Sequence, residues 1–234
     1  MTEPNPSFFV VGTDTDVGKT VASLMLMRFL IRTGHTPYYW KPVQTGCLSP
    51  NDAGADASFV LKYCPELQQT AAEATGACFN APKAPFYAAR DEQSSVEVED
   101  LLHKLAYLRK NNTLVVEAAG GLLVPFSRTH MLADMVQLAV QRFGIKPILV
   151  ARAGLGTINH TLLSIEALHH RGVQPAGIVF VNNKEHRTPQ AMLQENMEAI
   201  STFSNYSVCG CIPHIEDFSN PPEEAISLFE RIAG

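Results

Sequence analysis

The feature that most constrains this chain is a glycine-bearing loop at residues 12–20, placed between an apolar run and a helix start. The loop reads Gly-Thr-Asp-Thr-Asp-Val-Gly-Lys-Thr and follows the apolar residues 8–11. A β-rich run, a Gly-bearing loop and Gly-Lys-Thr opening a helix are the layout of a phosphate-binding P-loop. The backbone N–H groups of such a loop and the helix dipole favour phosphate oxygens. The sequence therefore predicts that the chain binds a nucleoside triphosphate.

Two residues of the loop have defined chemistry in a P-loop. Lys19 would reach the β- and γ-phosphates, and the Thr20 hydroxyl would bind Mg²⁺. The loop departs from the usual G-x-x-x-x-G-K-[ST] spacing, because five residues separate Gly12 from Gly18 and Thr13 stands where the first glycine belongs. An ordinary strand–loop–helix turn is the alternative interpretation, which Gly-Lys-Thr in this context disfavours.

Composition limits the classes of partner. The net charge of −5 predicts no broad basic surface for nucleic acid or an anionic membrane. Residues 1–7 are unlike a signal peptide, and no apolar run approaches membrane-spanning length. The five cysteines are odd in number and mostly scattered, which suits a reducing cytosol. We expect a cytoplasmic protein with small-molecule partners, folded as one domain over residues 1–234.

Strand-like and helix-like segments alternate along the chain. Later strands are expected at 36–40, 113–117, 147–151, 176–181 and 208–212, and helices at 20–32, 96–110, 131–143, 157–170, 189–201 and 221–232. Residues 68–90 have no sustained hydrophobic periodicity, which predicts an irregular segment with a short helix at its end. The alternation predicts an α/β fold, with a three-layer, doubly wound, mostly parallel sheet and helices on both faces.

Polar residues at the expected strand ends are candidates for a site, because ligands of open α/β sheets bind at the carboxyl ends of strands. Lys41 follows the expected strand at 36–40, where a functional cation would lie. The same position would suit an ordinary surface lysine equally well. Glu117 ends the strongest internal strand, just before Gly120-Gly121, and is the best candidate for an acid that binds Mg²⁺. Asp56 is a second candidate, which the sequence does not distinguish from Asp52.

Two later segments could bind an adenine base or an anion. Asn182 or Asn183 could hydrogen-bond an adenine edge after a strand. Asn183 also begins an N-K-x-D-like run, but His186 stands at the Asp position and supplies no anionic acceptor for guanine. Gly156-Thr157-Ile158-Asn159-His160 opens a helix after a strand, so it predicts either plain capping or an anion site.

Together these segments resemble the dethiobiotin synthetase family. Residues 12–20, Lys41-Pro42-Val43, Glu117-Ala118-Ala119-Gly120-Gly121 and 156–160 carry the resemblance, which runs from the first strand to Ile212-Pro213. The extra loop residue is normal in this family. The resemblance implies a P-loop NTPase-like fold, a homodimer, ATP and Mg²⁺. It also implies ATP-dependent carboxylation and ring closure of 7,8-diaminononanoate with CO₂ to dethiobiotin, through a carbamate and a carbamic–phosphoric anhydride.

The resemblance also implies roles for individual residues. Metal ligands would be Thr20, Asp56 and Glu117, and the catalytic cations around the carbamate and γ-phosphate would be Lys19 and Lys41. The expected nucleotide-binding residues are Asp16, Val17, Gly18, Lys19, Thr20, Glu117, Asn182, Asn183 and Pro213. The expected substrate-binding residues are Thr15, Lys41, Thr45, Gly156 and Asn159, with Asp16 also along the diamine and Thr45 where the family often has Ser. In the family the substrate carboxylate is held near the subunit interface.

Two departures and one rival class accompany this resemblance. Ala118 replaces a Gly of the usual E-G-A-G-G run, and Asn182-Asn183 replaces the commoner N-D. The rival class is a nucleotide-switch or partitioning-type P-loop ATPase, which generally carries an extra lysine early in the loop. Residues 12–15 contain none. A related amide ligase domain, the other alternative, would normally be attached to a glutaminase domain.

Overall fold

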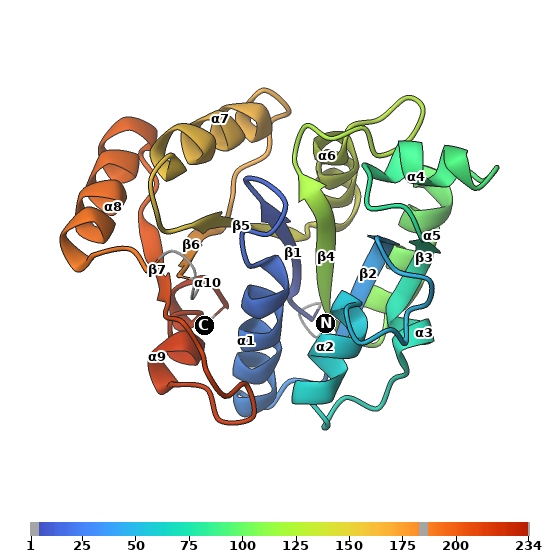
Figure 1. The fold of residues 1–234 in the computed structure, drawn as a ribbon, viewed down its shortest axis with the longest axis horizontal. Helices are drawn as coiled ribbons and strands as arrows, with labels where there is room; N and C mark the ends of the chain where they lie inside the picture. Colours follow the sequence, from blue (N-terminus) through green and yellow to red (C-terminus); the bar gives the residue numbers. More distant parts are fainter. Residues whose placement is uncertain (1–4, 183–186, 234) are drawn as a thin grey trace.

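A seven-stranded sheet organises the computed structural model, which describes residues 5–182 and 187–233 (Figure 1). All its paired strands are parallel, in the order β3-β2-β4-β1-β5-β6-β7. The strands are β1 (Ser7–Gly12), β2 (Pro37–Thr45), β3 (Thr75–Phe79), β4 (Thr113–Gly121), β5 (Lys146–Arg152), β6 (Gly177–Val181) and β7 (Val208–Ile212). The helices are α1 (Lys19–Arg32), α2 (Asp56–Tyr63), α3 (Ala71–Ala74), α4 (Pro85–Asp91), α5 (Val98–Arg109), α6 (Leu132–Phe143), α7 (Thr157–His169), α8 (Gln190–Ser204), α9 (Glu223–Ser227) and α10 (Glu230–Ala233).

The central strand β1 shows why the sheet is covered on both faces. All six of its residues are buried. Phe8 and Val10 pack in one apolar cluster with α1, α2 and α9, whereas Phe9 and Val11 pack in the other with α5, α6 and α7. Successive side chains of a strand point to opposite faces, so a continuous apolar run needs a helical layer on each side. The predicted three-layer α/β fold is confirmed.

Two strands extend further than the sequence predicts, and both carry site residues. β2 pairs with β4 over Pro37–Trp40 and with β3 over Lys41–Thr45, so Lys41 lies within the strand. β4 continues to Gly121 beside the end of β1, so Glu117 also lies inside its strand, opposite Val10. The predicted ends were wrong because these strands continue through Pro42 and through the small residues 118–121, which the sequence presents as turn formers.

The predicted irregular excursion over residues 68–90 was wrong, apart from the short helix at its end, α4. The segment holds helix α3, the edge strand β3 and α4. A capping box formed by Thr70 and Glu73 starts α3, and Pro85 starts α4. In β3, a Cβ added at Gly76 would lie 2.4 Å from the Pro42 carbonyl oxygen. That glycine, which looks like a strand breaker in sequence, allows β3 to approach β2 closely.

The single closing helix predicted at residues 221–232 is divided into α9 and α10. The Phe229 N–H donates to the Ile226 carbonyl at 3.2 Å, a tight turn that ends α9. Phe229 is fully buried in the same apolar cluster as α1, and this packing fixes the break. Among the described residues, no helix is both long and apolar enough to cross a membrane. The one-domain organisation stays a prediction.

Candidate active site at the carboxyl ends of the central strands

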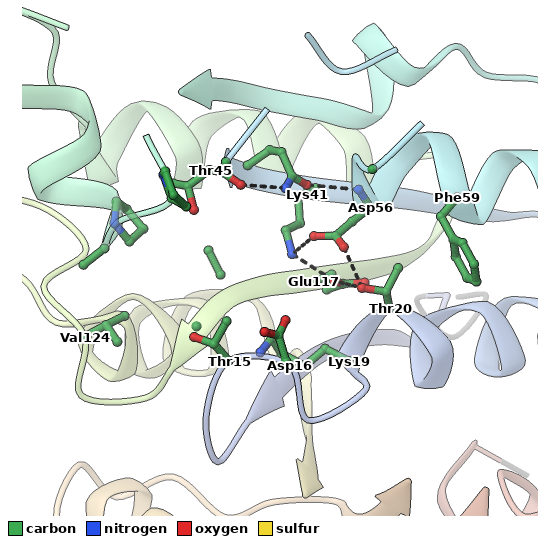
Figure 2. Close-up of a pocket in the computed structure, with 18 of the residues that line it drawn as sticks. Thr15, Asp16, Lys19, Thr20, Lys41, Thr45, Asp56, Phe59, Glu117 and Val124 are labelled. Carbon is green, nitrogen blue, oxygen red and sulfur yellow. Dashed lines mark hydrogen bonds and ion pairs between the residues drawn. The ribbon is translucent and has the colours of Figure 1, made fainter. Parts of the chain in front are cut away.

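A cavity of about 760 Å³ opens where β1, β2 and β4 end (Figure 2). The P-loop forms one side, the segment between β2 and α2 another, and the segments after β3 and β4 complete the wall. The predicted site residues that line it are Thr15, Asp16, Gly18, Lys19, Thr20, Lys41, Thr45, Asp56 and Glu117. The fold therefore brings these predicted residues from four separate segments of the chain to one cavity.

A glycine conformation and the Lys19 side chain hold the P-loop in shape. Gly18 caps α1 with a φ of 96°, a left-handed conformation that favours glycine. A Cβ there would also lie 2.6 Å from a Val181 methyl carbon, so no larger residue fits. The Lys19 ammonium donates to the Asp14 carbonyl at 2.7 Å and so arches back over the loop. The first residues of α1 line the cavity, and a helix N-terminus is where a phosphate would be favoured.

Beside the loop, buried Lys41 and Glu117 form a cluster with the partly exposed Asp56 carboxylate and the Thr20 hydroxyl (Figure 2). The Lys41 Nζ lies 2.6 Å from Asp56 Oδ2 and 2.8 Å from Glu117 Oε1. It also donates to the Ala118 carbonyl at 3.0 Å. Thr20 Oγ1 lies 2.7 Å from Asp56 Oδ1 and 2.9 Å from Glu117 Oε1. One ammonium against two carboxylates leaves the cluster with a net charge of −1.

The donor set of this cluster fits Mg²⁺. Thr20 has one hydroxyl proton but contacts two carboxylate oxygens, so one of its two short contacts has no hydrogen between the oxygens. A cation between the three oxygens would relieve that repulsion, and oxygen ligands are those that Mg²⁺ prefers. Among the described residues no three His, Cys, Asp or Glu side chains form a metal-binding group. Mg²⁺ does not require one, because it is usually bound by one or two carboxylates together with phosphate and water.

The two lysines of the site have different electrostatic surroundings. Burial opposes the charge of Lys41, but Glu117 and Asp56 outweigh it and raise its pKa to about 12. Burial and then the neighbouring Lys41 lower the pKa of Lys19 to about 8. Burial acts against ionised Asp56, yet Lys41 and Thr20 hold the pKa of that carboxyl below its usual value. The Lys41 charge is therefore already stabilised by two carboxylates of the protein, whereas the Lys19 charge would be stabilised by an incoming anion.

The sequence reasoning missed two residues of this site. The Tyr39 hydroxyl donates to Glu117 Oε2 at 3.0 Å, and the side-chain oxygen of Gln44 accepts from the Asp56 N–H at 3.2 Å. Burial and the Glu117 carboxylate raise the pKa of Tyr39 well above its usual value, so its hydroxyl remains a donor. The available signal was strand periodicity, because residues 39 and 41 share one face of β2.

The structure also separates the two acidic candidates of the loop after β2. Asp56 begins α2 and contacts both Thr20 and Lys41. Asp52 accepts the N–H groups of Leu48 and Ser49, at 2.8 and 3.2 Å, and thereby holds the turn before α2. Of the two, only Asp56 belongs to the cluster.

Several predicted site residues do not line the cavity: Val17, Gly156, Asn159, Asn182 and Pro213. Val17 is buried in the apolar layer that contains α1. Asn182 follows β6, and its side-chain oxygen accepts the Thr188 N–H at 3.1 Å. Asn183 lies outside the described residues. Base recognition by one of the two asparagines stays a prediction. Gly156 and Asn159 are exposed at the start of α7.

Known proteins resemble this chain in sequence over nearly its whole length. A family model described as an AAA domain matches residues 6–222. A protein of Lysinibacillus sphaericus strain C3-41, named ATP-dependent dethiobiotin synthetase BioD, is 36% identical over 233 residues, which cover 97% of this chain and 96% of that protein. A protein of the same name from Lawsonia intracellularis is 31% identical and covers 96% of each chain.

Solved structures resemble the fold at much lower identity. The MinC:MinD cell division protein complex of Aquifex aeolicus matches with a TM-score of 0.56 and 12% identity, over 97% of this chain and 94% of that one. A putative plasmid partition protein of Borrelia burgdorferi bound to AMPPNP matches with a TM-score of 0.53 and 13% identity, over 97% and 96%. At these identities the likeness shows the fold alone.

Proposed function

The chain belongs to the ATP-dependent dethiobiotin synthetase family, and on that premise we propose how its residues carry out ATP-dependent dethiobiotin formation. The observation that carries the proposal is the cluster of Lys41, Asp56 and Glu117 beside the P-loop lysine, in one cavity. Phosphoryl transfer needs positioned cations around the transferred group and asks little covalent chemistry of the protein. This cavity has such cations, with the P-loop beside them.

The proposed reaction begins when one amine of 7,8-diaminononanoate takes up CO₂ and loses a proton to become a carbamate. A carbamate oxygen then attacks the γ-phosphorus, and ADP leaves. The second amine attacks the carbamoyl carbon of the resulting carbamic–phosphoric anhydride, which closes the cyclic urea and releases phosphate. Lys41 would stabilise the carbamate and the transferring phosphoryl group, and Lys19 would exchange the Asp14 carbonyl for phosphate oxygens.

We also propose that Mg²⁺ is held by Thr20, Asp56 and Glu117. When bound with ATP, the ion would neutralise charge on the phosphate oxygens during transfer. The support is the net charge of the cluster and the single Thr20 proton shared between two carboxylates. Thr15, Asp16 and Thr45 also line the cavity. With these residues along the diamine, the substrate would lie between the P-loop and the end of β2. Cytoplasmic localisation belongs to the same proposal, supported by five free cysteines.

The test is ADP formation with each component supplied or withheld. We expect ADP to form only when diamine, bicarbonate and Mg²⁺ are all present, with one dethiobiotin per ADP by mass spectrometry. Removal of Mg²⁺ with a chelator should stop the reaction, and added Mg²⁺ should restore it. A partitioning-type ATPase would release ADP at the same rate with or without diamine and bicarbonate, and that result would contradict the proposal.

The carboxylate of the diamine requires a second binding region. It lies at the far end of an apolar chain, so the phosphate loop cannot hold both ends of the substrate. Gly156 caps α7 with a φ of 87° and no side chain. The Thr157 N–H donates to the Gly154 carbonyl at 3.2 Å, so the N–H groups of Ile158 and Asn159 are the ones that we propose for an anion. Because Gly156 and Asn159 lie outside the cavity of their own chain, we propose that they bind the substrate carboxylate of a partner's site in a homodimer.

Asn159→Ala is therefore expected to raise the KM for the diamine by about 10-fold, since it removes one neutral donor worth roughly 1–1.5 kcal/mol. The KM for ATP should stay within 2-fold, because the P-loop is untouched. Asn111→Ala, at another exposed asparagine, is the matched control and should change neither constant. An equal rise in both KM values would contradict the assignment.

Mixed dimers test whether the site is shared. Lys41→Ala chains lack the proposed catalytic cation, and Asn159→Asp chains present a carboxylate that repels the substrate's own. If each site uses both chains, a dimer of the two variants contains one site free of both changes and should regain activity. Wholly separate sites would give no recovery.

A further inference from the structure

Tyr39 lies next to the cluster but outside the cavity, and the proposed reaction gives it no role. Its side chain is completely buried, and its hydroxyl donates to Glu117 Oε2 at 3.0 Å. Tyr39 and Lys41 occupy the same face of β2, so both reach Glu117 on the neighbouring strand β4. A tyrosine hydroxyl in an apolar layer needs a polar partner, and here that partner is a site carboxylate.

Tyr39 and the cluster divide the two oxygens of Glu117 between them. Oε1 lies 2.8 Å from the Lys41 ammonium and 2.9 Å from the Thr20 hydroxyl, whereas Oε2 accepts from Tyr39. Glu117 has no exposed surface, so solvent cannot replace a lost donor. A buried carboxylate oxygen without a donor is costly, and the carboxylate would turn toward other donors if the Tyr39 hydroxyl were removed.

The position of Tyr39 is itself fixed from both sides. On one side its backbone pairs with Val115 of β4. On the other, the Gln69 side chain accepts the Tyr39 N–H and donates to the Tyr39 carbonyl, each at 2.9 Å. Gln69 thus takes the place of a strand where β3 has not yet begun, because the pairing of β2 with β3 starts at Lys41. A residue anchored in this way can hold a carboxylate in one orientation.

We propose that Tyr39 is a positioning residue for Glu117. Its hydroxyl fixes Oε2 and thereby keeps Oε1 between Lys41 and Thr20, in the orientation that presents this oxygen to a cation. The inference rests on the proposed function in one respect, namely that the cation is the Mg²⁺ of the nucleotide. Loss of a hydrogen bond behind a metal ligand typically weakens metal affinity by 10- to 100-fold.

Tyr39→Phe removes only the hydroxyl oxygen and keeps the ring in its buried place. We expect the Mg²⁺ concentration for half-maximal ADP formation to rise about 10-fold, with the KM for the diamine unchanged. Calorimetric binding of Mg²⁺ with a non-hydrolysable ATP analogue should weaken by the same factor, which provides a readout independent of turnover.

The neighbouring residue offers a matched control. Tyr38→Phe removes the same atom from a hydroxyl that donates to the Glu73 carbonyl at 3.0 Å, away from the cluster. It should leave both Mg²⁺ measurements unchanged, even if it lowers the melting temperature. A Tyr39→Phe enzyme that loses thermal stability but keeps the wild-type Mg²⁺ titration would show a merely structural tyrosine and overturn the inference.

Two double mutants, in which Tyr39→Phe is combined with a change at Asp56 or at Glu117, test whether Tyr39 acts through Glu117. In Asp56→Asn the Glu117 carboxylate remains, so adding Tyr39→Phe should still weaken Mg²⁺ binding about 10-fold. In Glu117→Gln the carboxylate is gone, so the same addition should change binding by less than about 2-fold. Equal effects in both backgrounds would overturn the inference. A wild-type enzyme without any Mg²⁺ dependence would overturn the proposed metal site together with it, whereas failure of the Tyr39 tests alone would leave that site standing.

Discussion

Lys41→Ala is expected to lower turnover by about three orders of magnitude while ATP still binds. Its ammonium is the cation that the fold places deepest in the site, with 4% of its side chain exposed, between Asp56 and Glu117. A preorganised donor at a developing charge contributes roughly 3–4 kcal/mol to transition-state stabilisation. The carbamate is the main proposed partner of Lys41, so ATP affinity should change little. Single-turnover ADP formation and calorimetric ATP binding measure the two quantities separately.

The control for this variant is Lys83→Ala. Lys83 also lines the cavity, but 53% of its side chain is exposed and it pairs with Asp91. Its loss should change turnover by only a few-fold. Lys41→Ala also leaves two carboxylates close together without their cation, so the melting temperature should fall without Mg²⁺ and recover with it. If Lys41→Ala loses ATP affinity as severely as Lys19→Ala, the assignment of separate roles to the two lysines is wrong.

Lys19→Ala is expected to lose both ATP affinity and turnover, the latter by at least two to three orders of magnitude. The Lys19 ammonium bridges the P-loop by its bond to the Asp14 carbonyl, and it is the cation nearest the start of α1. Alanine removes the proposed partner of the phosphates and leaves the Asp14 carbonyl without its donor. Equilibrium binding of a labelled ATP analogue and single-turnover ADP formation would measure both losses.

A conservative replacement should not rescue the enzyme. The Lys19 stem packs against Gly12, where an added Cβ would lie 2.9 Å from the Lys19 Cδ. The wider guanidinium of Lys19→Arg has no room to follow this path, so we expect this variant to remain within about 10-fold of the alanine variant. ATP affinity within a few-fold of wild type in Lys19→Ala would contradict the phosphate-binding role.

The parts of the structure that the sequence predicted are those determined by local pattern. Gly18 and Lys19 belong to a motif whose spacing specifies strand, loop and helix together. Lys41 and Glu117 could be placed near one another because parallel strands bring their carboxyl ends to one edge of the sheet. The central strands could be predicted from local sequence, because a continuous apolar run indicates a strand that is buried on both faces.

The parts that the sequence did not predict depend on contacts between distant residues. Gly76 reads as a breaker until the Pro42 carbonyl is seen beside it. Asp56 and Asp52 are equivalent in sequence, and only the positions of Thr20 and Lys41 separate them. Tyr39 reads as one apolar residue of a strand, and its hydroxyl acquires a role only through Glu117, which lies 78 positions away.

The order of the strands links completion of the site to folding of the nascent chain. In the sheet β4 separates β2 from β1, although it is made after both. Glu117 is 97 residues from Thr20 and 76 from Lys41, so at roughly 5–20 residues per second the ribosome delivers it about 4–15 seconds after Lys41. Until β4 enters, β1 and β2 have no shared neighbour and the Lys41 ammonium has no Glu117 to bury against. The strand that joins the two halves of the sheet also delivers Glu117, so an unfinished chain lacks both.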